Sequence, residues 1–280
     1  MDKLLYIILG GAATLLVLVL GSALVSRVFV SRYKRKLIKT ISKESLPSFS
    51  REQITSLPAP VQRYLLHVIS ENHPAIRYAV LEQRATFRHG PERPWFRVKA
   101  REIISGMEPG WVWDAVLIHK GGIRRTAKLS YVQGEAHGHI KFLGAFTTQE
   151  LHGPETDTSM LFRLLSEVVW IPTAFLPTKT LRWEPIDDAT AKAVITDGPT
   201  RVSAMFHFNQ DNEIERITTS DKYRDHKSGF EQASFTMVCS SYKEFDGVKI
   251  PTQVDFIWNL ETGDFDYGHF TITSARYHYA

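Results

Sequence analysis

An uninterrupted apolar run near the N-terminus constrains this chain more than any other feature. Residues 4–26 contain no charged side chain. A helix of about 20 apolar residues, rising about 1.5 Å per residue, crosses a hydrocarbon core about 30 Å thick. We therefore expect residues 1–30 to form a transmembrane anchor. A basic juxtamembrane connector over residues 31–49 and a single soluble β-rich domain over residues 50–280 would follow it.

The flanking charges predict how such an anchor is oriented. Seven lysine or arginine residues lie between residues 27 and 43, whereas only Lys3 precedes the run. Because basic flanks favour the cytoplasmic side, we expect a single-pass cell-membrane protein with a cytoplasmic soluble domain. The alternative is a signal peptide cleaved near residues 21–23. That signal would have a long apolar core and only one base before it.

The positive net charge belongs to the connector and not to the domain. Residues 1–44 hold eight bases and two acids, and the rest of the chain holds 26 bases and 28 acids. A nucleic-acid binder would carry its basic patch on the folded domain, so we expect no nucleic-acid partner. The connector suits anionic lipid headgroups, at about 1 kcal/mol per base near the surface. The bases expected to contact them are Arg32, Lys34, Arg35, Lys36 and Lys39.

From residue 76 onward, apolar and polar residues alternate with a period of two. The alternation is clear in residues 95–101, 201–208 and 253–260, and Gly-, Pro- and Asp-rich turns separate such segments. This pattern is typical of half-buried antiparallel strands, and we expect about eleven of them before residue 279. The single cysteine, Cys239, excludes an internal disulfide and a multi-cysteine zinc site.

Three segments carry helical patterns. Ser50 and Gln53 have the spacing of a capping box, and apolar residues in 61–69 recur at helical intervals. A third helix is expected over residues 156–170, between two blocks of strands. The fold class is therefore mainly β (α+β). It comprises the N-terminal transmembrane helix, two leading helices, and a large curved, half-barrel-like antiparallel sheet with one inserted helix.

Such a sheet with one covering helix encloses a concave apolar face, which is either packed solid or left open for a ligand. An open face would bind a lipid or other lipophilic ligand, with the apolar segment 170–177 as a lid. The aromatic residues expected to contact the ligand are Trp111, Trp113, Trp170, Phe175, Phe256 and Trp258.

The sequence offers few candidate catalytic residues, and it contains no phosphate loop, GxSxG elbow or HExxH helix. Asp114 and Glu167 are acids in apolar surroundings, where burial raises a carboxyl pKa, and Arg224 completes a weak catalytic set. The simpler interpretation is that each acid pairs with a nearby arginine as a structural bridge.

Residues 137–139 contain the candidate metal ligands of the sequence. His137 and His139 would face the same side of a strand, with Glu150 or His152 as a third ligand. The alternative is two solvent-facing histidines beside a glycine. We predict no metal and no cofactor.

Six segments of the sequence are distinctive as a set, together with Trp258 and Tyr267: 57–65, 111–115, 167–177, 183–188, 221–225 and 247–251. Together they resemble a family of membrane-anchored proteins of unknown function, the DUF6544 or DUF6920 group. The resemblance covers essentially the whole chain and implies no activity and no catalytic residues. A weaker analogy of fold is with the half-barrel lipoprotein carriers of the bacterial envelope.

Three hypotheses for function follow. The leading one is a membrane-tethered binding module for a lipid or other lipophilic ligand. The second is an enzyme acting on a membrane-derived substrate, which requires Asp114, Glu167 and Arg224 to converge in a pocket. The third is a non-catalytic interaction protein at the membrane, which requires a filled core and an exposed apolar patch. The sequence identifies no protein partner.

Overall fold

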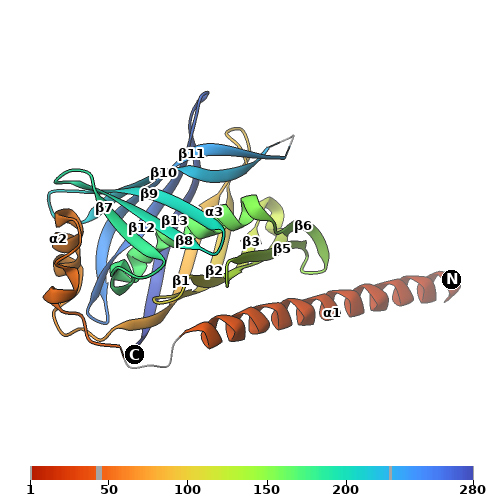
Figure 1. Cartoon of the computed structure of the whole chain (residues 1–280). Coiled ribbons are helices and arrows are strands. Elements are labelled where there is room, and N and C mark those ends of the chain that lie inside the picture. The colour runs from red at the N-terminus through yellow and green to blue at the C-terminus, as the bar shows by residue number, and fades with distance from the viewer. Residues whose placement is uncertain (1, 42–45, 227–228, 280) are drawn as a thin grey trace.

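The computed structural model describes residues 2–41, 46–226 and 229–279. These residues form one 13-stranded sheet in the order β6-β5-β4-β3-β2-β1-β13-β12-β11-β10-β9-β8-β7, with every neighbouring pair antiparallel. The sheet curls around the inserted helix α3 (Pro154–Glu167) in Figure 1. The prediction of a mainly β, half-barrel-like fold is therefore confirmed.

The strands follow one another along the chain mostly as hairpins. Their number exceeds the expected eleven, because short strands such as the edge strands β6 and β7 carry too few residues for a clear alternation. The strands are β1 (Ile76–Phe87), β2 (Phe96–Ser105), β3 (Gly110–Ile118), β4 (Arg124–Val132), β5 (Glu135–Phe142), β6 (Phe146–Leu151), β7 (Leu181–Pro185), β8 (Thr190–Asp197), β9 (Thr200–Phe208), β10 (Ile214–His226), β11 (Gly229–Phe245), β12 (Val248–Leu260) and β13 (Gly263–Tyr279).

The helices lie on both sides of the sheet. The predicted capping box is present, with Gln53 accepting a hydrogen bond from the Ser50 backbone N–H at 2.9 Å. The inserted helix is also confirmed and is extended by short 3-10 turns. The helical elements are α1 (Asp2–Thr40), η1 (Arg51–Ile54), α2 (Ala59–Val68), η2 (Lys120–Gly122), α3 (Pro154–Glu167), η3 (Val168–Trp170) and η4 (Pro172–Phe175).

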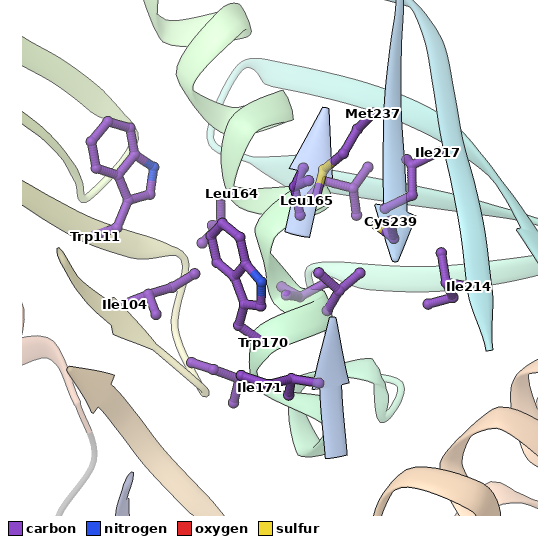
Figure 2. Packing of buried hydrophobic residues seen from close by; sticks show 14 of the residues in the cluster. Ile104, Trp111, Leu164, Leu165, Trp170, Ile171, Ile214, Ile217, Met237 and Cys239 are labelled. Atoms are coloured by element: carbon purple, nitrogen blue, oxygen red, sulfur yellow. The ribbon is translucent and has the colours of Figure 1, made fainter. Parts of the chain in front are cut away.

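The main core lies between the concave face of the sheet and α2, α3, η3 and η4. The inserted helix α3 leads from edge strand β6 to edge strand β7 and packs against β9 and β10. In Figure 2, Trp170 lies among Ile104, Leu164 and Leu165, all of which are buried. The chain connection between the two sheet edges therefore fills much of the open side of the curl.

A second, smaller cluster holds α1 against the opposite face of the sheet. Leu37 of α1 is fully buried there with Val80, Ile103 and Val112. A Cβ at Gly110 would lie 2.5 Å from Leu37 Cδ1, so the helix approaches β3 at a distance that glycine permits. Because core and helix cover both faces, the start of β3 is buried without alternation.

The N-terminal helix runs without a break from the predicted anchor through residues 31–40 of the predicted connector. None of the helices built by the described residues combines the length and apolar character that crossing a bilayer requires.

Candidate functional site

The candidate site is a cavity of about 510 Å³ lined by α3 and by strands from both halves of the sheet. Pockets for small ligands usually measure about 300–1,000 Å³. Aromatic side chains make up much of the lining, which is consistent with an apolar ligand. They are Phe87, Phe96, Trp113, Phe162, Tyr223, Phe230, Phe235, Phe256, Trp258, Phe265, Tyr267 and Phe270.

These rings support one another in edge-to-face contacts. The ring centroids of Phe235 and Trp258 are 4.8 Å apart, and those of Phe256 and Phe270 are 5.0 Å apart. Alternating positions on β11, β12 and β13 place these rings on the concave face. The contacts fix the rings in position, so this part of the lining is preformed.

One wall of the cavity carries a buried ionic cluster centred on Arg163 of α3. Its Nη2 donates to Glu102 Oε1 at 2.9 Å, and its Nε donates to Glu167 Oε1 at 2.9 Å. Glu102 is fully buried, and Glu167 is 2% exposed. Gln83 extends the network by donating to Glu102 at 2.7 Å and accepting the indole N–H of Trp113 at 2.8 Å. This wall is therefore polar but largely self-satisfied.

Burial changes the protonation of this cluster. It raises the pKa of Glu167 well above its usual value, although the Arg163 guanidinium opposes that rise. Burial lowers the pKa of Arg163, but Glu167 and Glu102 more than offset this, so its net shift is upward. Glu167 Oε2 is buried without a hydrogen-bond partner. Burial therefore favours the protonated form of Glu167 more than in an exposed carboxyl group, and Arg163 opposes this.

A second cation, Lys222 of β10, lines the same cavity. Its Nζ lies 4.8 Å from the centroid of the Phe235 ring and 5.1 Å from that of Phe162. No hydrogen bond or ion pair joins this ammonium group to any side chain that the structure describes. Burial, together with the charge of Arg163, lowers the pKa of Lys222 to about 8, and Glu167 opposes the shift.

A match to a family model identifies the family of this chain. The model of DUF6544, a family of unknown function, matches residues 47–270. The chain belongs to the DUF6544 family. The family predicted from the six sequence segments is thus confirmed.

Comparisons with individual proteins give distant similarities to this DUF6544 chain. A DUF1329 family protein from Desulfovibrio piger is 10% identical, with 79% of this chain and 94% of that chain covered and a TM-score of 0.45. A LolA superfamily protein from Nitrosomonas europaea is 10% identical, with 80% and 96% covered and a TM-score of 0.41. No curated protein matches the chain.

The aromatic residues expected to contact a ligand divide into two groups. Trp113, Phe256 and Trp258 line the cavity, and their contact with a ligand stays a prediction. Trp111 and Trp170 do not line it and are fully buried in the core. Their indole N–H groups donate to the carbonyls of Met160 at 3.3 Å and Pro251 at 3.1 Å.

The expected lid, residues 170–177, is part of the packed core. Phe175 is fully buried and is stacked on Trp183 at a centroid distance of 5.3 Å. It also lies 5.2 Å from the Tyr64 ring, which comes from α2. Because none of residues 170–177 lines the cavity, the lid interpretation is wrong. The apolar character of this segment reflects packing against α2, β7, β9 and β12.

The structure does not bring the three residues of the catalytic hypothesis together. Asp114 pairs with Lys128 on the neighbouring strand and is not among the cavity residues. Glu167 and Arg224 both line the cavity, but each has its own partner. Arg224 Nη2 is 2.7 Å from Glu231 Oε2, and Glu167 is bound to Arg163. This arrangement fits the structural-bridge interpretation better than a catalytic set.

The weak metal candidates also have other contacts. His137 Nε2 is 3.2 Å from Glu135 Oε2, and its ring lies 5.3 Å from that of Tyr33 in α1. The His139 ring lies 4.7 Å from that of Phe29. Within the described part of the chain, no three His, Cys, Asp or Glu side chains are grouped to hold a metal ion. These histidines instead lie against α1.

Sequence reasoning missed the polar wall of the cavity, although one signal was present. Glu102 follows Phe96, Val98 and Ala100 at the same inward-facing positions of β2, so a charged residue occupies a core position. A charge there requires a buried partner. The partner, Arg163, is 61 residues further along the chain. Lys222 was harder to place, because a bulge between Thr219 and Lys222 breaks the alternation of β10.

Proposed function

We propose that this DUF6544 protein is a membrane-tethered binding module for a lipid or other lipophilic ligand. The observation that carries the proposal is the aromatic-lined cavity of about 510 Å³. Moving apolar ligand surface from water into such a cavity contributes about 25 cal/mol of favourable free energy per Å². The interaction-protein hypothesis required a filled core, which this cavity argues against.

The apolar run over residues 4–26 supports the tether, and contacts of α1 suggest how the domain would sit on it. Ser22 donates a hydrogen bond to the carbonyl of Gly144, in the β5–β6 turn, and accepts one from Lys141 Nζ at 3.2 Å. With residues 4–26 in the membrane, this turn would lie at the lipid surface. Two large apolar side chains beside it suit that position, since Leu143 is 48% exposed and Phe146 is 49% exposed.

The cavity would then face the membrane. Strand register places the β1–β2, β3–β4 and β5–β6 turns at one end of the sheet. Phe87 and Phe96, which flank the β1–β2 turn, both line the cavity. A lipophilic ligand could thus pass between bilayer and cavity over a short distance. Exposed bases of α1 would contact anionic headgroups; they include Arg32, Lys34, Arg35 and Lys39, with Lys36 partly buried.

Photocrosslinking of the full-length protein in membranes tests the binding proposal. A diazirine-bearing alkyl probe should label peptides of β4, β11 and β12 that line the cavity. Ala127→Phe fills the cavity from β4 and should abolish this labelling. Thr271→Phe adds the same ring on an exposed position of β13 and should leave it unchanged. Labelling confined to α1, or equal labelling in both variants, would refute the proposal.

The cytoplasmic placement of the domain needs a separate test in intact cells. Glu261 lies in the exposed β12–β13 turn, and the native Cys239 is buried, so Glu261→Cys supplies one accessible thiol. We expect an impermeant maleimide to react only after the cells are lysed. Reaction in intact cells would place the domain outside.

A further inference from the structure

The cavity contains an ammonium group that lies among aromatic rings, and this bears on what the ligand is. Lys222 Nζ lies 4.8, 5.1 and 5.9 Å from the ring centroids of Phe235, Phe162 and Trp258. The rings compensate part of the cost of burying a charge, since their faces attract cations. They provide no acceptor for the three ammonium hydrogens.

The two buried carboxyl groups on this wall of the cavity pair with Arg163 and not with Lys222. Glu102 is committed to Arg163 and Gln83, through bonds of 2.9 and 2.7 Å. Glu167 has its Oε1 bound to Arg163 Nε at 2.9 Å. Arg163 thus engages both carboxyl groups, and the Lys222 ammonium has no hydrogen-bond acceptor among the side chains that the structure describes.

We propose that the cavity binds a single-chain amphiphile with an anionic head group, which pairs with the Lys222 ammonium while the apolar chain lies along the aromatic walls. This inference rests on the proposed function and adds the ligand class to it. An ion pair shielded from water at this position would select acidic amphiphiles over neutral ones of equal chain length. A neutral head group would leave the cation without a partner.

Two matched probes test the head group, both with the same diazirine-bearing alkyl chain. One ends in a carboxylate and the other in a hydroxyl group. In the full-length protein, we expect the acid probe to label cavity peptides at about tenfold lower concentration than the alcohol, as for a charge-assisted hydrogen bond. Lys222→Met should remove this preference, and Lys222→Arg should retain it.

Lys249→Met is the matched control, because Lys249 pairs with Glu213 at 2.7 Å outside the cavity. It should behave as the wild type. If Lys222→Met keeps the preference for the acid, or if both probes label the wild type equally, the head-group inference is refuted while cavity binding stands. If neither probe labels cavity peptides, the proposed function itself fails.

Discussion

Replacing Arg163 with methionine should destabilise the domain strongly. Arg163 is the single cation bound to two buried carboxyl groups, at 2.9 Å each, and its guanidinium carbon lies 4.2 Å from the centroid of the Trp111 ring. Methionine keeps much of the apolar stem but leaves Glu102 as a buried charge without its counterion. Breaking a buried pair in this way costs about 3–5 kcal/mol.

The magnitude follows from which carboxyl group loses its partner. Burial raises the pKa of Glu167, so this carboxyl group can take up a proton when Arg163 is lost, and most of the cost arises from Glu102, which is fully buried. For a domain of this size, about 3–5 kcal/mol corresponds to a fall in melting temperature of about 6–20 °C. Arg163→Lys keeps the charge but loses the planar two-donor geometry, and we expect it to cost less, about 1–3 kcal/mol.

Thermal and urea unfolding of the full-length protein in detergent would measure these differences. The double variant Arg163→Met with Glu102→Gln removes the uncompensated charge and should recover at least about half of the lost stability. The reasoning would be refuted if Arg163→Met unfolded within about 1 kcal/mol of the wild type. It would equally fail if the second substitution lowered stability further.

Three other predictions follow from the geometry. Binding of the acid probe should be nearly constant from about pH 6 to 7.5 and should weaken at higher pH, because burial lowers the pKa of Lys222 to about 8 and the ammonium group then loses its proton. Arg163 stays charged throughout, and a pH-independent affinity measured by titration would contradict this prediction. Leu37→Ala should weaken the docking of α1 on the sheet by a free energy of about 2–5 kcal/mol, which would appear as faster hydrogen exchange in residues 27–40. Unchanged exchange would contradict the packing of Leu37 described above. Phe175→Ala should cost about 3–5 kcal/mol of stability by calorimetry, whereas a lid would show faster probe entry at unchanged stability.

Local patterns predicted most of the elements of this fold. Alternation over residues 95–101 and 253–260 lies in β2 and β12, and the apolar spacing in 156–170 became α3 and η3. The packing of α1 on the sheet was not predicted, because basic residues are interspersed with the apolar residues of its stripe. Val30, Tyr33 and Leu37 recur at helical spacing within that basic segment and contact the sheet.

The candidate site was predictable only in part, for a physical reason. Aromatic residues on strands identify a concave apolar face, and Trp113, Phe256 and Trp258 do line the cavity. Whether a given ring lines a cavity or fills the core depends on contacts between distant segments. Phe175 packs on Tyr64 and Phe206, which are 111 residues before it and 31 after it in the sequence. Such pairs leave no local pattern.

The most direct test of the central claim is native mass spectrometry of the full-length protein, purified from membranes and released from detergent micelles. We expect the wild type to carry a discrete added mass that extracts as a lipophilic acid, and Ala127→Phe to be released without it. If the wild type is bare and stays bare after incubation with membrane lipids, the cavity does not hold a lipophilic ligand and the account is wrong.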